Sequence, residues 1–128
     1  MKILITGGAG FIGSHLAERL LNEGHHVHVI DNLSTGSLDN IESFKQHSNF
    51  RYTIGTILNR ELLEKLMSGV DQVYHLAAAV GVKYIIENPL LSLKTNIVGT
   101  DNVLELANKH KAKVLITSTS EIYGKSEN

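Results

Sequence analysis

The chain has 128 residues, of which 42% are hydrophobic and 20% are charged, values typical of a single globular domain. A net charge of −1 argues against nucleic acid or an anionic membrane as a partner, and the absence of cysteine excludes disulfides and thiolate chemistry. Because no apolar run reaches the length of a membrane span and no signal peptide is evident, we expect a cytoplasmic location.

The first predicted elements are a strand at residues 2–6 and a helix at residues 11–22, which enclose a glycine-rich turn. A tight strand-to-helix turn without a ligand would use some glycine. The pattern also fits G-x-G-x-x-G and G-x-x-G-x-x-G, in which a helix N-terminus offers free N–H groups to a phosphate. The glycines are Gly7, Gly8, Gly10 and Gly13.

A second apolar strand, residues 26–30, ends at Asp31, where a dinucleotide fold has its ribose-binding acid. An aspartate that caps the next turn is the alternative, but it does not account for the glycines. The polar loop 32–37 contains no Lys or Arg, whereas a 2′-phosphate would need one. The order strand, glycines, helix, strand, acid therefore predicts dinucleotide binding and favours NAD over NADP.

Apolar and helical segments alternate through the rest of the chain, which predicts an α/β fold with right-handed crossovers. We expect a Rossmann-type doubly wound parallel sheet of about five strands in the order 3-2-1-4-5, incomplete at its C-terminal side because no sequence remains for a sixth strand. The expected elements are a short helical stretch at 38–46, a strand at 50–54, a helix at 60–67, a strand at 72–76, a helix from Pro89 to about residue 110 and a strand at 114–117.

Three further groups of residues need a separate interpretation. The histidines at 25, 26 and 28 lack a fourth ligand nearby, so we expect a structural role and no metal site, and His75 is expected in the core. The alanines at 77–79 suit either a flat ligand or a tight helix contact. The stretch 118–121 follows a strand at the carboxyl edge of the sheet, where ligands bind, although an ordinary capped loop has the same composition.

Five stretches in order, TGGAGFIGSH, DNLSTG, YHLAA, NPLLSLKTNIVGT and STSEIYG, resemble the N-terminal part of the extended short-chain dehydrogenase/reductase family, within it the nucleotide-sugar epimerases, dehydratases and decarboxylases. The resemblance implies NAD as cofactor, a nucleotide sugar as substrate and reversible oxidation at sugar C4. The cofactor-binding residues it implies are Gly7, Gly10, Phe11, Ile12, Gly13, Asp31, Asn32, Ser34, Thr35, Gly36, Leu76, Ala77, Ala78 and Asn96, and the implied catalytic residues are Thr119, Ser120 and Glu121.

Two departures from that family affect what the chain can do. Thr56 and Ile57 occupy the position of an Asp-Ile or Asp-Val pair that binds the adenine, so that contact weakens to a hydroxyl or is lost. No Tyr-x-x-x-Lys pair is present, and the position four residues after Tyr123 is Glu127. We therefore expect residues 1–128 to be a truncated NAD-binding domain that lacks the catalytic helix and the sugar lobe and is inactive alone.

The sequence leaves the subtype open between epimerase, decarboxylase and dehydratase, and it favours an epimerase or decarboxylase that acts on a UDP-sugar. The Thr-Ser-Glu stretch at 119–121 resembles UDP-glucuronate decarboxylases more than dTDP-glucose dehydratases, which have an acid at the middle position. It also resembles GDP-mannose dehydratases, which use NADP. A stand-alone NAD-binding or sensing module without catalysis is the alternative function.

The helix at residues 90–109 is also predicted to associate two chains. Leu93, Ile97 and Leu104 are expected to pack on the sheet, while a second stripe on another flank is left for a homodimer contact. That second stripe consists of Leu91, Val98 and Leu106.

Overall fold

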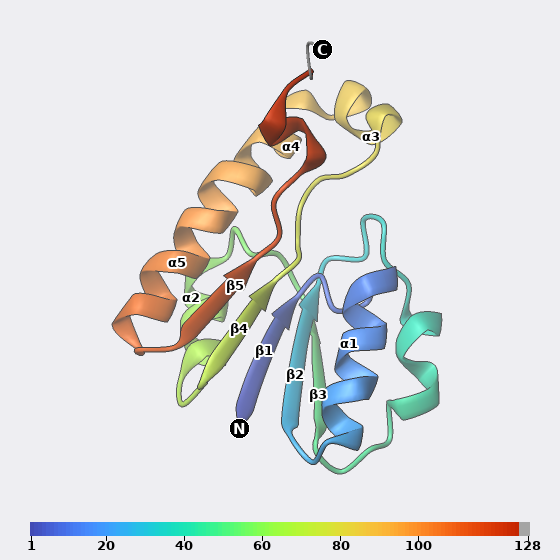
Figure 1. The fold of residues 1–128 in the computed structure, drawn as a ribbon, viewed down its shortest axis with the longest axis vertical. Coiled ribbons are helices and arrows are strands. Elements are labelled where there is room, and N and C mark those ends of the chain that lie inside the picture. The colour runs from blue at the N-terminus through green and yellow to red at the C-terminus, as the bar shows by residue number, and fades with distance from the viewer. Residues whose placement is uncertain (126–128) are drawn as a thin grey trace.

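The computed structural model describes residues 1–125 and contains one parallel sheet of five strands in the order β3-β2-β1-β4-β5. This confirms the predicted fold class and strand order. Each strand pairs in parallel with its neighbours, so all the carboxyl ends lie along one edge (Figure 1). The strands are β1 (Lys2–Thr6), β2 (His26–Asp31), β3 (Phe50–Ile54), β4 (Gln72–His75) and β5 (Lys113–Ile116).

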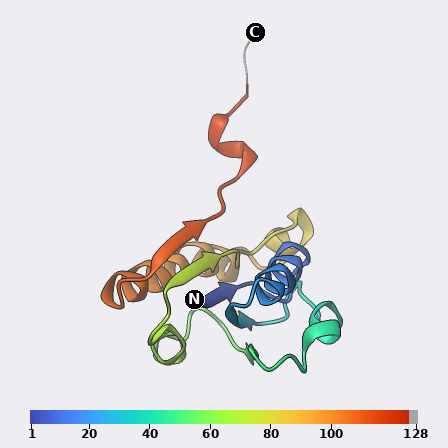
Figure 2. The ribbon, with the colours of Figure 1, turned by 60° about the horizontal axis from the view of Figure 1, so that its bottom comes forward.

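Helices cover both faces of this sheet, as Figures 1 and 2 show. One face carries α1 (Phe11–Asn22) and the 3₁₀ helix η1 (Leu38–Phe44), while the other carries α2 (Arg60–Met67) and the long helical segment that precedes β5. After β5 the chain leaves the sheet and forms a short 3₁₀ helix, η3 (Ser120–Tyr123), which projects from the body of the molecule in Figure 2.

The alternation of side chains along β1 builds two separate cores. Ile3 and Ile5 face α1 and η1, and they pack with Val27 and Val29 of β2. Leu4 faces the other way and joins the core beneath α2 and the long helical segment. Because β1 is covered on both faces, its continuous apolar sequence is what a central parallel strand requires.

The segment around Pro89 differs from the single long helix that the sequence predicts. Pro89 does occupy the first turn of α4 (Pro89–Lys94), but a π-helical turn, η2 (Thr95–Gly99), separates α4 from α5 (Thr100–Lys109). A further short helix, α3 (Val82–Glu87), is not predicted from the sequence. The π turn changes the rotation per residue, so the side-chain faces before and after it do not follow one helical period.

The prediction of which apolar residues of this segment pack on the sheet is wrong. Leu93, Ile97 and Leu104 are 56%, 60% and 44% exposed. The buried face is centred on Gly99, where an added Cβ would overlap the Ile57 side chain. This segment therefore approaches the sheet through Gly99 and polar residues and, farther along, through the fully buried Val103 and Leu106. Leu106, predicted on the second, outward stripe, lies in the core instead. The buried residues are Ser92, Gly99, Asn102, Val103, Leu106 and Ala107.

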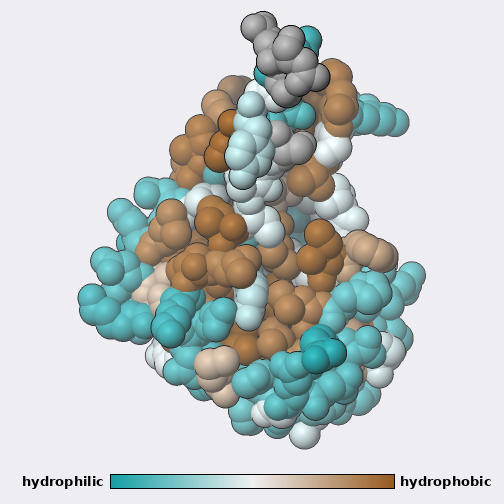
Figure 3. Space-filling view, viewed as in Figure 1, coloured by the Kyte–Doolittle hydropathy of each residue, from teal (hydrophilic) through white to brown (hydrophobic). Residues whose placement is uncertain are grey.

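Apolar side chains also gather on the face of the sheet formed by β4 and β5, which none of the described helices covers in the view of Figure 1 (Figure 3). Leu115 of β5, which pairs with Tyr74 of β4, is about half exposed there. Within residues 1–125, no helix combines the length and the apolar character that a membrane span requires.

Candidate functional site

The turn between β1 and α1 is held by glycines that the surrounding protein itself requires. Gly7 has a φ of 72°, and a Cβ there would lie 2.9 Å from the Ala77 backbone nitrogen. A Cβ at Gly8 would overlap Val29, and a Cβ at Gly13 would overlap the Gly7 carbonyl oxygen. These three glycines let the turn fit tightly against the sheet, so their presence alone does not indicate a ligand.

Gly10 is different from its neighbours in the turn. Its φ of −77° and ψ of 176° are open to any residue, and a Cβ there would meet only the Gly7 carbonyl oxygen, at 3.3 Å. Gly10 precedes α1, and no side chain of the described residues caps that helix N-terminus. Phe11 and Ile12 at the first turn are largely exposed. The backbone N–H groups of this turn therefore face a space that a phosphate can enter.

Asp31 lies at the carboxyl end of β2 and is tied to the glycine turn. Its Oδ2 accepts a hydrogen bond of 2.9 Å from the Ala9 backbone nitrogen, and its Oδ1 accepts one of 2.8 Å from Leu33. A carboxylate offers about four acceptor positions, so two remain for a ligand. Leu33 has a φ of 60°, which turns the chain sharply after Asp31 and leaves the half-buried carboxylate accessible.

The loop after β2 returns to the same turn. The Ala9 carbonyl accepts hydrogen bonds from the Ser37 backbone nitrogen and the Asn40 side chain. A Cβ at Gly36 would lie 3.0 Å from both Ala9 and the Asp31 carboxylate, so only glycine lets the loop come this close. The remaining predicted residues of this loop, Asn32, Ser34 and Thr35, are exposed.

The carboxyl end of β4 borders the turn on its other side. Ala77 donates its backbone N–H to the Thr6 hydroxyl, at 3.1 Å, and Ala79 donates to the Asn96 side chain of η2, at 2.8 Å. Leu76 and Ala77 are partly buried, whereas Ala78 is exposed. The structure thus brings the predicted segment 76–78 and the Gly7 turn into contact, and Asn96 holds the backbone that follows.

Three polar side chains beneath this edge were not predicted as part of the site. His75 is buried, with Nδ1 2.7 Å from the Thr6 hydroxyl and Nε2 2.9 Å from the Thr100 hydroxyl. Burial lowers the pKa of His75 below its usual value of 6.5, so the neutral imidazole is favoured. These contacts join β1, β4 and α5. The only sign of these contacts in the sequence is Thr6, a polar residue at the end of a mostly apolar predicted strand.

Two predicted cofactor residues lie farther into the protein. Thr56 uses its hydroxyl to accept a hydrogen bond from the Leu58 backbone nitrogen, at 3.1 Å. The Ile57 side chain is 4% exposed and belongs to the core beneath α2 and α5. The Ile57 carbonyl accepts from Asn102, at 3.0 Å. The structure places the Ile57 side chain in the core, away from the open edge.

The predicted catalytic residues lie on the segment that follows β5. Thr119 caps η3 and accepts a hydrogen bond from the Glu121 backbone nitrogen, at 3.3 Å. Both residues are exposed, and Ser120 is the first residue of η3. This segment rises from the same edge of the sheet as the glycine turn (Figure 1). Glu127, the residue at the position of the family's lysine, lies outside the described residues.

The two histidines of β2 differ in their surroundings. Nε2 of His28 lies 2.8 Å from the Thr53 hydroxyl. His26 is exposed at the amino end of the strand. No group of metal-ligating side chains suited to a cation is found within residues 1–125.

Comparison with known proteins extends along almost the whole chain. A family model described as GDP-mannose 4,6 dehydratase matches residues 4–128. A UDP-glucuronic acid decarboxylase 1 from Danio rerio is 46% identical over 126 residues, which make up 98% of this chain and 29% of that relative. The chain thus spans under a third of the length of this relative.

Solved structures agree with the sequence comparison. The dTDP-glucose 4,6-dehydratase DesIV from Streptomyces venezuelae, solved with NAD bound, has a TM-score of 0.91 and 33% identity, over 100% of this chain and 42% of that one. The UDP-glucose 4-epimerase from Thermotoga maritima, solved with UDP-glucose, has a TM-score of 0.88 and 36% identity, over 100% of this chain and 41% of that one.

Proposed function

Because the chain belongs to the GDP-mannose 4,6 dehydratase family, we propose that it forms the NAD-binding part of an enzyme that acts on a UDP-sugar. The space at Gly10 carries this proposal. The protein needs the other glycines of the turn for its own packing, but it leaves room at Gly10 that a Cβ would fill. A pyrophosphate that approaches the backbone there accounts for glycine at this position.

The neighbouring groups suit the rest of the cofactor. The first turn of α1 offers its N–H groups and the positive end of the helix dipole to the pyrophosphate. Asp31 would accept hydrogen bonds from the ribose hydroxyls, and its negative charge would oppose a 2′-phosphate. Leu76, Ala77 and Ala78 would border the cofactor on the β4 side. When bound, NAD would supply the hydride acceptor for oxidation at a sugar carbon.

For the reaction itself we propose UDP-glucuronate-like decarboxylation, with epimerisation of a UDP-sugar as the second candidate. The Thr119 hydroxyl would bind the sugar hydroxyl that is oxidised, and Glu121 lies on the same exposed segment. Support comes from the Danio rerio relative, which is named for decarboxylation of UDP-glucuronic acid. The epimerase candidate is supported by the likeness to the Thermotoga maritima structure.

A pair of glycine variants tests the cofactor proposal. We expect Gly10→Ala to leave the free energy of unfolding within about 1 kcal/mol of the wild type, because its backbone conformation suits alanine. The same change should weaken NAD binding at least about tenfold, because the methyl group occupies the space of the pyrophosphate. Calorimetric titration with NAD and NADP measures both the loss and the preference.

Gly13→Ala is the matched control for this pair. Its Cβ would overlap the Gly7 carbonyl, so it should reduce the free energy of unfolding by about 2–3 kcal/mol. Unchanged NAD affinity in a folded Gly10→Ala chain would refute the proposed pyrophosphate position. Equal or tighter binding of NADP by the wild type would refute the role of Asp31.

The enzymatic part of the proposal has a separate test in the coding frame. Continuation past Asn128 into a segment with a Tyr-x-x-x-Lys pair would supply the base that the family resemblance requires. A stop codon directly after Asn128 would overturn the assignment as part of an enzyme, while the NAD proposal would still depend on the titrations.

A further inference from the structure

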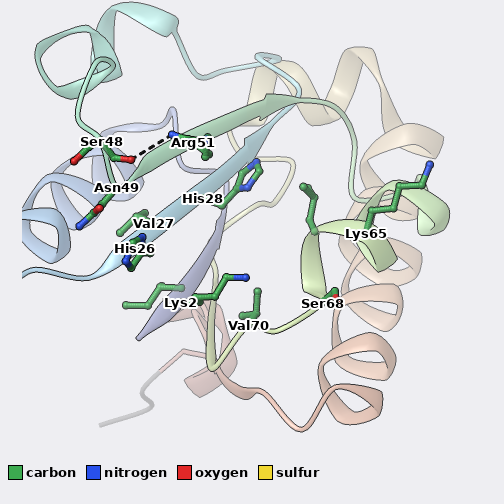
Figure 4. A pocket seen from close by; sticks show the side chains of 12 residues that line it. Lys2, His26, Val27, His28, Ser48, Asn49, Arg51, Lys65, Ser68 and Val70 are labelled. Carbon is green, nitrogen blue, oxygen red and sulfur yellow. Dashed lines mark hydrogen bonds between the residues drawn. The ribbon is translucent and has the colours of Figure 1, made fainter.

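A cavity of about 320 Å³ lies at the amino-terminal edge of the sheet, opposite the glycine turn (Figure 4). It is formed by the first residues of β1 and β2, the segment around β3 and the C-terminal end of α2. Its volume is at the lower end of the range of small-molecule sites. Neither the NAD proposal nor the sugar proposal uses this cavity.

The charges that line the cavity are all of one sign. Lys2, Arg51 and Lys65 contribute permanent positive charge, and His26 and His28 add two imidazoles, while no carboxylate lines it. The whole chain carries 13 acidic against 12 basic residues, so this is a local excess. Figure 4 shows the Lys65 ammonium turned away from the other side chains. Lys65 pairs with Glu61, one turn earlier on the same helix, α2.

Sheet register brings these side chains together. Lys2 of β1 pairs with His26 of β2, and His28 of β2 pairs with Arg51 of β3. Paired residues on neighbouring strands lie about 5 Å apart on the same face. Each pair thus sets a permanent cation beside an imidazole, and protonation of His28 would place like charges side by side unless an anion lay between them.

Each of the basic groups retains hydrogen-bonding capacity. The Arg51 guanidinium donates through one nitrogen to the carbonyls of Ser48 and Phe50, which hold it at the cavity. Of the two ring nitrogens of His28, only Nε2 has a partner within residues 1–125, the Thr53 hydroxyl. The Lys2 backbone nitrogen donates to Asp71 Oδ2, at 2.8 Å.

The positive charges around the cavity also affect the pKa of His28. Burial lowers the pKa of His28 below 6.5, and the positive charges of Arg51 and Lys2 lower it further. An anion in the cavity would oppose both repulsions. Anion binding and protonation of His28 are therefore linked, and each favours the other.

We propose that this cavity is a binding site for a phosphoryl group, either free phosphate or the phosphate of a nucleotide. Two permanent cations and two imidazoles suit a dianion better than a single carboxylate, and a guanidinium matches the geometry of phosphate oxygens. Leu66 and Val70, which line the cavity and belong to the core beneath α2, form an apolar wall that reduces solvent screening around the charges. The site would let the protein sense phosphate-bearing molecules away from its cofactor edge.

Imidazole NMR of the 128-residue chain tests this proposal, with His28 assigned through a His28→Gln variant. Inorganic phosphate at constant ionic strength should raise the pKa of His28, because a bound dianion stabilises the imidazolium. Acetate should have no such effect. Uridine monophosphate provides the second arm: tighter binding than inorganic phosphate would identify a nucleotide as the source, and weaker binding would identify free phosphate.

Two variants separate this site from general charge effects. Lys2→Gln should weaken phosphate binding about tenfold, the effect of one charge-assisted hydrogen bond. Lys113→Gln removes a charge from the first residue of another strand at the same edge, outside the cavity, and should leave the binding unchanged. If Lys2→Gln impairs folding, Arg51→Gln serves in its place, with amide spectra as the check of folding.

Gly10→Ala separates the cavity from the glycine turn, because phosphate can also reach the N-terminus of α1. The effect of phosphate on His28 should persist in Gly10→Ala. The proposal is overturned if phosphate leaves the titration of His28 unchanged, if Lys113→Gln and Lys2→Gln lose affinity equally, or if Gly10→Ala abolishes the effect.

Discussion

Two threonines mark the ends of two strands at the same edge of the sheet, and their surroundings differ. Thr6 at the end of β1 is fully buried, and its hydroxyl contacts Nδ1 of His75 and the backbone nitrogen of Ala77. Thr119, three residues past β5, is exposed and accepts one long hydrogen bond from Glu121. The proposed cofactor side of the edge is therefore fixed by contacts between strands, whereas the proposed catalytic side is positioned by local turns.

This difference shows which part of the site the described residues can build by themselves. Backbone hydrogen bonds from Gly7 to the Ile30 carbonyl and from Leu76 to the Thr6 carbonyl join the Gly7 turn and the segment after β4 to the strands. The backbone N–H groups of Ala9 and Ala77 add hydrogen bonds to the side chains of Asp31 and Thr6. Thr119 and Glu121 depend on a short 3₁₀ helix with few neighbours, and local stability follows the density of buried contacts. The proposed binding function is thus better supported by this chain than the proposed reaction.

Thr6→Val should have the largest effect of the changes that test this contrast. The variant keeps the volume but removes the hydroxyl, so His75 Nδ1 and the Ala77 N–H lose a buried partner. We expect the free energy of unfolding to fall by about 2–3 kcal/mol, since each orphaned buried group costs about 1–3 kcal/mol. Chemical denaturation measures it, and Thr6→Ser, which keeps the hydroxyl, is the control. A loss in Thr6→Ser equal to that in Thr6→Val would contradict the hydrogen-bond explanation.

The sequence predicted the strand order and the glycine turn because both depend on local signals. Apolar runs of four to six residues alternate with helical periods, and the turn has its glycines at fixed spacing. The spacing of the glycines does not show which of them the fold itself requires, because Gly10 and Gly13 differ in what the rest of the fold places beside them. The predicted site residues remain predictions where no ligand contact is known.

The register of the long helical segment could not be predicted for a related reason. A face chosen by hydrophobicity selects Leu93 and Ile97, but the real face is selected by the close approach of Gly99 to Ile57. That contact joins positions 42 residues apart in the sequence, and the π turn then breaks the period on which the prediction relies. The same long-range dependence hid the contact of His75 with Thr6 and Thr100.

The exposed apolar residues of this helical segment bear on how two copies of the chain would associate. We propose that the segment at 90–109 forms a two-fold homodimer, because Leu91 and Val98 of the predicted stripe are 45% and 46% exposed. Leu104, expected on the sheet, is 44% exposed and takes the place of Leu106, which is buried. A new charge at the contact should weaken association more than about tenfold. We expect Val98→Glu to shift light scattering from dimer to monomer, with Glu105→Gln as a control on the same helix. A wild-type chain that stays monomeric at high concentration would refute this interface.

A change of pH is expected to have a smaller effect on the free energy of unfolding. This effect arises from His75, which lies on the buried side of the edge. The pKa of His75 is lowered by burial, so between the unfolded value near 6.5 and the lower folded value the unfolded chain binds more protons. The free energy of unfolding is therefore fully retained above pH 6.5 and decreases as the pH falls toward the folded pKa. Its neighbours Thr6 and Thr100 are neutral, so no ion pair offsets this.

Denaturation at a series of pH values measures this slope. His28 has a lowered pKa as well, so the wild-type slope contains both contributions. His75→Gln should reduce the slope between pH 6.5 and the lower folded pKa, and His28→Gln should reduce it independently, since the two lie on different edges of the sheet. A slope unchanged in His75→Gln would show that the buried imidazole does not resist protonation.

The smallest effect is expected for Thr119→Val, the counterpart of Thr6→Val. Thr119 is exposed and its single long hydrogen bond caps only a four-residue 3₁₀ helix, so the free energy of unfolding should change by less than about 0.5 kcal/mol. NAD affinity should also stay within about twofold, because no described contact joins Thr119 to the glycine turn. Denaturation and calorimetric titration of the same sample measure both quantities. A loss of unfolding free energy as large as that of Thr6→Val would mean that the β5 side is as tightly organised as the β1 side. The contrast between a self-supporting binding region and a weakly positioned catalytic segment would then be wrong.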